Sequence, residues 1–181
     1  MSHTKSYKIW DPLIRLFHWS LVIGFASNAL ITDPESNLHE YIGYAIAGLI
    51  AFRLIWGLIG TKYARFSSFM PSRGSINTQL DDIITARRST HLGHSPLGAL
   101  MIFNLIATII GIAITGYMMT TVTFWGIGWV EETHEILVTW AKLSIVLHIA
   151  ALLWESRRTG VNLARAMVTG IKAIPETVKI K

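Results

Sequence analysis

Four long apolar stretches dominate the pattern of hydrophobic and polar positions along the chain. They cover approximately residues 13–31, 39–59, 97–119 and 134–154. A helix of about 20 apolar residues crosses the hydrocarbon core of a bilayer, and each stretch reaches that length. Polar or helix-breaking sequences such as Thr32-Asp33-Pro34 and Gly60-Thr61-Lys62 end them. The pattern therefore predicts an all-α membrane protein, a bundle of four transmembrane helices.

The segments between and after these spans are polar. The link over residues 62–96 contains a candidate surface helix at about 76–88. The tail over about 161–173 is amphipathic, with Arg165 and Lys172 on its polar side, and predicts a second surface helix. The sequence shows no internal repeat. We expect the whole chain, 1–181, to form a single transmembrane domain.

Composition supports a membrane location and excludes several kinds of metal site. Only 15% of the 181 residues are charged and 51% are hydrophobic, with a mean hydropathy of +0.44. Soluble domains carry about 25% charged residues. Cysteine is absent, which excludes a disulfide, a thiolate iron–sulfur cluster and covalent attachment of a c-type haem. Any haem in this protein must be bound non-covalently.

The distribution of charge predicts the orientation in the membrane. All basic residues except Lys142 lie before or just inside span one, from the end of span two through the following link, or after span four. The other two connections carry only acids: Asp33, Glu35, Glu131 and Glu132. Basic loops stay in the cytoplasm, so both termini and the long link should be cytoplasmic. The segment 124–129 then reads as an aromatic anchor at the outer interface.

The histidines carry the candidate chemistry, because ionisable groups inside membrane spans are costly and are functional by default. His134 and His148 are 14 residues apart in span four, hence within roughly 40° of one helix face and about 21 Å apart along the axis. With the predicted orientation, His18 lies level with His148 and His39 level with His134. His3 lies near the N-terminus and is expected to be inert.

Two facing pairs of imidazoles predict two haems held between the helices. Paired histidines on neighbouring helices hold a haem iron from both sides. The expected axial ligands are His18 with His148 for the inner haem b and His39 with His134 for the outer one. With both axial positions occupied by histidine, the natural role is electron transfer across the membrane.

Small and basic residues near these histidines fit a haem site, with alternatives left open. Gly43, Ala47, Ala141, Gly24 and Ala26 would leave room for a porphyrin, although small residues are common at membrane helix contacts. Arg53 lies on the face of His39 at the inner level, where it would either bind a haem propionate or extend to the cytoplasmic interface. Lys142 would bond a propionate or a neighbouring helix.

Other interpretations of the histidines remain. A single intramembrane histidine is often only a structural hydrogen-bond partner, but four at matched depths are harder to explain in that way. His91 and His94 precede Ser95-Pro96 at the expected start of span three. A structural or capping role is the default for both, with contact to a haem edge or a quinone as the alternative.

Several short motifs resemble the bacterial cytochrome b561 family, which includes the cytochrome b subunit of membrane nickel–iron hydrogenases. They are Arg15-x-x-His18-Trp19, His39-x-x-x-Gly43-Tyr44, Arg53-x-x-Trp56-Gly57, His94-x-Pro96-Leu97-Gly98, His134-Glu135 with His148, and the closing Arg165-Ala166-Met167-Val168-Thr169-Gly170. The resemblance implies a four-helix membrane bundle, two haems b and the same ligand pairs. It also implies electron exchange between a partner and the quinone pool of the bacterial inner membrane.

Three functions follow from these observations. The first is a di-haem cytochrome linking a periplasmic redox protein, either a c-type cytochrome or a dehydrogenase such as a hydrogenase, to quinone. The second is a stand-alone quinone-linked oxidoreductase of a small substrate such as superoxide, which the acidic outer loops disfavour. The third is a histidine-lined metal or proton transporter, although no span carries an Asp or Glu deep inside.

Overall fold

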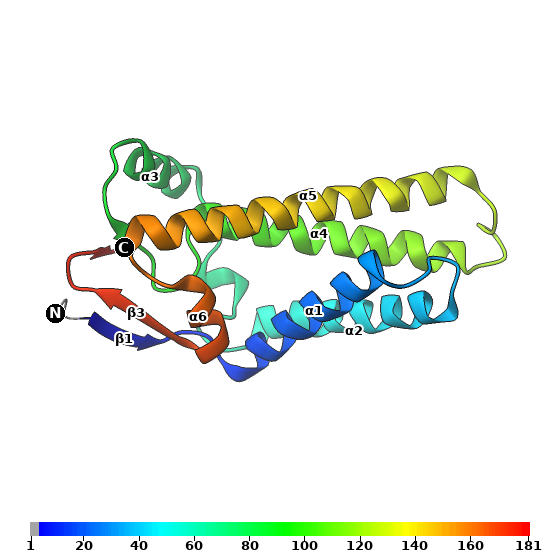
Figure 1. Cartoon of the computed structure of the whole chain (residues 1–181), viewed down its shortest axis with the longest axis horizontal. Helices are drawn as coiled ribbons and strands as arrows, with labels where there is room; N and C mark the ends of the chain where they lie inside the picture. Colours follow the sequence, from blue (N-terminus) through cyan, green and yellow to red (C-terminus); the bar gives the residue numbers. More distant parts are fainter. Residues whose placement is uncertain (1–3) are drawn as a thin grey trace. The chain divides into compact units, whose positions relative to one another are not determined.

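Four long helices organise the structure, a computed structural model that describes residues 4–181. They are α1 (Pro12–Leu30), α2 (Asn37–Ile59), α4 (Pro96–Met119) and α5 (Gly128–Thr159), and each is long and apolar enough to cross a membrane (Figure 1). The four predicted spans are confirmed, with ends within two residues for the first three. His3 lies outside the described residues.

The fourth helix is longer than the sequence pattern predicts. α5 begins six residues before the expected span and ends five residues after it. Apolar content marks only the part of a helix that crosses the lipid core, while the backbone stays helical into the polar interface. Glu131 in the first turn and Arg157 and Arg158 in the last turn complement the helix dipole. Residues 124–127 of the expected aromatic anchor, 124–129, therefore lie in the loop, and the last two residues begin α5.

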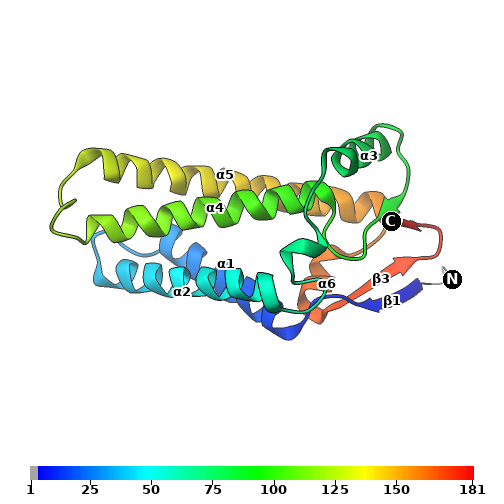
Figure 2. The same ribbon diagram turned by 180° about the vertical axis from the view of Figure 1, so that it is seen from behind.

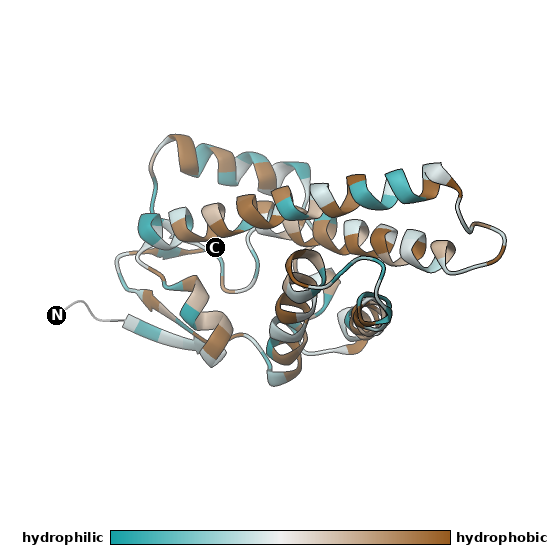
Figure 3. Cartoon of the chain, turned by 45° about the vertical axis from the view of Figure 1, so that its right-hand side comes forward, coloured by the Kyte–Doolittle hydropathy of each residue, from teal (hydrophilic) through white to brown (hydrophobic). Residues whose placement is uncertain are grey.

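The long helices bury little of their apolar surface inside the protein. Between 11% and 22% of each hydrophobic window is buried. Large side chains such as Leu16, Ile23 and Leu58 are exposed, and hydrophobic residues recur along the helices in Figure 3. Exposed apolar surface of this extent is a lipid-facing surface. The protein is a multi-pass membrane protein.

By its internal contacts the chain divides into two units, which are described separately. The first, here called the helical unit, comprises Leu16–Leu54 and Phe103–Val146. Its apolar core joins three helices through Phe17 of α1, Ile46 and Ile50 of α2 and Ile109 of α4. A Cβ added at Gly111 of α4 would lie 2.9 Å from Leu137 Cδ1, so the glycine allows α5 to pack closely on α4.

The second, here called the terminal unit, comprises Met1–Arg15, Ile55–Ile102 and Leu147–Lys181. It contains a two-stranded antiparallel sheet of β1 (Thr4–Lys8) and β3 (Ile171–Pro175), in which Tyr7 is opposite Lys172 (Figures 1 and 2). Short β2 (Ser89–Thr90) pairs in parallel with β4 (Lys179–Ile180). None of these strands is predicted by the pattern of apolar residues.

Both expected surface helices exist, but their bounds differ from the prediction. The first is α3 (Arg73–Ile84), which starts three residues early because Ser72 and Ser75 form a capping box. The second is only α6 (Leu163–Thr169), which ends at Gly170 with φ +81°. The chain then continues as β3, so the expected helix over 161–173 is too long. A short helix, η1 (Phe66–Ser68), completes the link before α3.

Hydrogen bonds fix the start of α1 in the terminal unit. Asp11 accepts hydrogen bonds from the backbone N–H of Ile14 and from the side chains of Thr61 and Trp56. Arg15 donates to the carbonyl of Val168 at 2.6 Å. The arginine of the first family motif therefore ties α1 to α6.

Candidate functional site

His39 and His134 both lie in the helical unit. His39 lies in the first turn of α2 and His134 in the second turn of α5. Both side chains are half-buried. Their pairing as ligands, from helices that are far apart in the sequence, stays a prediction.

A threonine hydroxyl lies at the Nδ1 atom of each of these two imidazoles. Thr115 Oγ1 of α4 is 3.0 Å from His134 Nδ1, and Thr32 Oγ1 is 3.4 Å from His39 Nδ1. Nε2 is then the nitrogen of each ring that is left for a metal. Sequence reasoning missed both threonines, treating Thr32 only as the end of a span and Thr115 as part of an apolar stretch.

The glycines near the two rings differ in their surroundings. A Cβ added at Gly116 would lie 3.3 Å from His134 Cε1, so the imidazole packs directly on the helix backbone there. One turn after His39, a Cβ added at Gly43 would have no atom within 4 Å. Two nitrogen donors, engaged Nδ1 atoms and open space beside a glycine all fit a haem.

The residues expected at the inner haem lie in different units. His18 is in the helical unit and His148 in the terminal unit, and both are half-buried. Their pairing stays a prediction. Arg53, also in the helical unit, is only 4% exposed. A side chain that extends to the aqueous interface would end in solvent, whereas this guanidinium is enclosed by protein.

Ser95 and Gln79, rather than His91 and His94, cap α4. Ser95 Oγ accepts from the Gly98 N–H, and Gln79 Oε1 accepts from the Leu97 N–H at 2.9 Å. His94 packs between the rings of Trp10 and Phe69, each with its centroid 4.5 Å away. Such packing fits a structural role for His94.

His91 and Lys142 differ in their surroundings. His91 is half-buried, and its backbone carbonyl accepts a hydrogen bond from Lys172. Burial, and then the charges of Lys172 and Lys181, lower the pKa of the His91 imidazole, so it is neutral at pH 7. Lys142 is exposed on α5.

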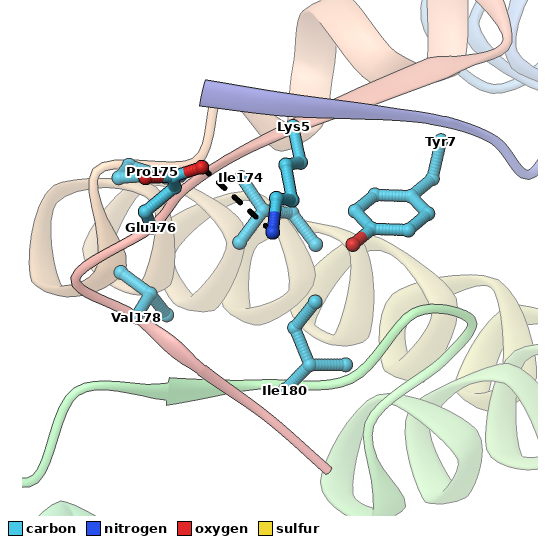
Figure 4. Close-up of a pocket in the computed structure, with 7 residues that line it drawn as sticks. All are labelled: Lys5, Tyr7, Ile174, Pro175, Glu176, Val178 and Ile180. Atoms are coloured by element: carbon cyan, nitrogen blue, oxygen red, sulfur yellow. Dashed lines mark ion pairs between the residues drawn. The ribbon is translucent and has the colours of Figure 1, made fainter. Parts of the chain in front are cut away.

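The terminal unit contains a separate cavity of about 240 Å³ (Figure 4). Lys5 and Glu176 form an ion pair of 3.8 Å at its edge. None of the candidate haem ligands lines it. Across residues 4–181, no three His, Cys, Asp or Glu side chains cluster in a way that would hold a bare metal ion.

Apolar helices long enough to cross a membrane, with half-buried histidines on three of them, are typical of a membrane cytochrome b, an electron-transfer protein that binds haem b. Residues 9–170 match the family Prokaryotic cytochrome b561, and the chain belongs to that family. The match confirms the family resemblance and the helical-bundle fold. Comparisons with curated proteins and with solved structures gave no match.

Proposed function

We propose that this cytochrome binds two haems b and carries electrons between a redox partner outside the membrane and the quinone pool. His18 and His148 would hold the inner haem, and His39 and His134 the outer one. The protein would lie in the bacterial inner membrane, with both termini in the cytoplasm and with a respiratory c-type cytochrome, dehydrogenase or hydrogenase as its periplasmic partner.

The observation that carries this proposal is the His39–His134 pair. Its two rings come from α2 and α5, and the hydroxyls of Thr32 and Thr115 lie at the Nδ1 atoms. Nε2 of each imidazole is therefore the nitrogen that would serve as an axial ligand of the haem iron. A haem with two histidine ligands supplies a one-electron iron(III)/iron(II) couple and has no vacant position for a substrate.

Arg53 is the candidate partner of a haem propionate. Arg53 is 4% exposed and lies 14 residues after His39 on α2, close to the same helix face. Arginine binds carboxylates through two parallel hydrogen bonds. Burial supports this role over the alternative in which the side chain extends to the interface.

Acidic side chains support a basic partner on the outer side. Asp33, Glu35, Glu131 and Glu132 are all exposed and all belong to the helical unit. Charge of one sign at a docking surface speeds encounter with a partner of the opposite sign, and salt weakens the effect. A basic c-type cytochrome fits this surface, whereas anionic superoxide does not.

Ligand substitutions test the proposal. His134→Ala and His148→Ala should each lower the haem content from two to one per chain, measured by the pyridine haemochrome assay on detergent-purified protein. His18→Ala should lose the same haem as His148→Ala, judged by the remaining absorption band and midpoint potential. His94→Ala is the matched control and should keep both haems. Loss of both haems from folded His148→Ala protein, or of one from His94→Ala, would contradict the ligand assignment.

A further inference from the structure

The hydroxyl proton of Thr115 is already used within α4. Thr115 Oγ1 donates to the carbonyls of Gly111 at 2.8 Å and Ile112 at 3.1 Å. A hydroxyl has one proton, and when that proton is donated within α4 the oxygen acts toward His134 as an acceptor. In this arrangement the 3.0 Å contact has the proton on His134 Nδ1 and leaves the lone pair of the neutral ring on Nε2.

A similar contact occurs at the second histidine, from the turn that follows α1. Thr32 Oγ1 donates to the backbone carbonyl of Asn28 at 3.0 Å, and the side-chain oxygen of Asn28 lies 3.1 Å away. Thr32 Oγ1 lies 3.4 Å from His39 Nδ1, where its oxygen acts as an acceptor when its proton is donated to Asn28. Two threonines from different parts of the chain thus favour the same tautomer in both rings.

We propose that Thr115 and Thr32 are positioning residues that hold His134 and His39 in the Nδ1–H form and set the potential of the outer haem. The inference rests on the proposed function. A hydrogen-bond acceptor at Nδ1–H orients a ligand imidazole and makes its other nitrogen a stronger donor. Stronger donation favours iron(III) over iron(II), so each threonine lowers the midpoint potential.

The two threonines should differ in strength. Thr115 is buried at 7% exposure and makes the shorter contact, while Thr32 is half-buried and lies 0.4 Å farther from its ring. Hydrogen bonds weaken with distance and are stronger where water is excluded. Thr115 therefore has the larger effect on the potential, and both act on one iron because His134 and His39 share it.

Redox titration of the purified holoprotein, followed in the visible spectrum, tests this inference. Thr115→Val keeps the branched shape and removes the hydroxyl. It should change the iron(III)/iron(II) ratio of one haem by up to about tenfold, which is about 59 mV for one electron, toward a higher potential. The other haem should be unchanged, and Thr115→Ser should restore the original value. Thr32→Val should raise the potential of the same haem by less.

Thr108 supplies the matched control within the same helix. It is 6% exposed and donates to the Asn104 carbonyl at 2.8 Å, as Thr115 donates to that of Gly111, but its hydroxyl contacts no histidine. Thr108→Val should leave both potentials unchanged.

Three results would overturn the inference with two haems still bound: unchanged potentials in Thr115→Val, an equal shift in Thr108→Val, or shifts in different haems for the Thr115 and Thr32 variants. If the Thr115→Val protein binds only one haem, the potentials of the Thr32→Val protein are compared with those of the wild type instead, and unchanged potentials overturn the inference. Wild-type protein without haem would instead overturn the proposed function.

Discussion

Lys172 gives a pH dependence of stability whose size follows from its burial. The side chain points inward from β3, is 3% exposed, and donates to the carbonyls of His91 at 2.5 Å and Leu92 at 3.5 Å. Burial lowers the pKa of Lys172 from its ordinary 10.5 to about 8, although Glu155 acts in the opposite direction. The folded protein therefore holds this proton less tightly than the unfolded chain does.

The sign of the pH effect follows from this difference. Between pH 8 and 10.5 the unfolded state binds more protons, so the free energy of unfolding rises with pH. At 1.36 kcal/mol per pH unit, the total effect is about 3 kcal/mol, of which about 1.4 kcal/mol falls between pH 7 and pH 9. The loss of stability caused by burying the charged Lys172 side chain is greatest below pH 8 and disappears above pH 10.5.

Thermal unfolding of wild-type protein and Lys172→Met in detergent, followed by far-ultraviolet circular dichroism, tests this value. Methionine has a similar length and does not titrate. The charged and titratable groups nearby, His91, Lys181, Asp82 and Glu155, are present in both proteins, so most of their own titration cancels in the comparison. From pH 7 to pH 9 the wild type should gain about 3 to 5 °C in Tm relative to the variant. Parallel pH profiles for the two proteins would refute the reasoning.

Three further predictions concern glycines and a buried carboxylate. Gly170→Ala places a Cβ 2.7 Å from the Trp10 carbonyl oxygen, whereas Gly160→Ala shares the positive φ but meets only ordinary contacts. Gly170→Ala should therefore lower the free energy of unfolding by about 1–3 kcal/mol more than Gly160→Ala. Equal losses for the two variants in denaturant titrations would argue against the collision. Asp82 is buried and its pKa is lowered, first by Lys181 and then by Ser89, so its stabilisation is complete above pH 4 and is lost as the pH falls through the folded pKa. Lys181→Met should therefore reduce stability at pH 7 more than at pH 3, and an equal loss at both values would contradict this. Gly116→Ala should lower the occupancy of one haem in the haemochrome assay, because its Cβ would displace His134. Gly48→Ala should have no effect, because the space around that glycine is open. Full haem occupancy in both variants would count against a haem at His134.

The apolar pattern was enough to predict the four spans, because the length of a membrane helix is set by the bilayer and not by its neighbours. The sheet of β1 and β3 could not be predicted in this way. Its strands have five residues each and are separated by most of the chain, so neither is marked by local periodicity. Gly170 was the available signal, since a glycine at that point is a common helix end and the expected helix ran through it.

Some features of the candidate site could likewise be predicted from the sequence, and others could not. His39 and His134 could be proposed as a pair from the sequence, because helix length and loop charge predict the same depth for both. Thr115 could not be predicted to contact His134, since that contact depends on the rotation of α4 against α5. That rotation is set by close packing at Gly111 and by hydrogen bonds from Asn104 to Ser144 and from Trp140 to Asn104.

The most direct test of the central claim is a dithionite-reduced minus oxidised spectrum of the purified protein, with a pyridine haemochrome titration for stoichiometry. Sharp low-spin b-type bands and two haems per chain are the predicted result. A colourless protein that cannot be reconstituted with haem, or a saturated content of one haem per chain, would contradict the two histidine pairs.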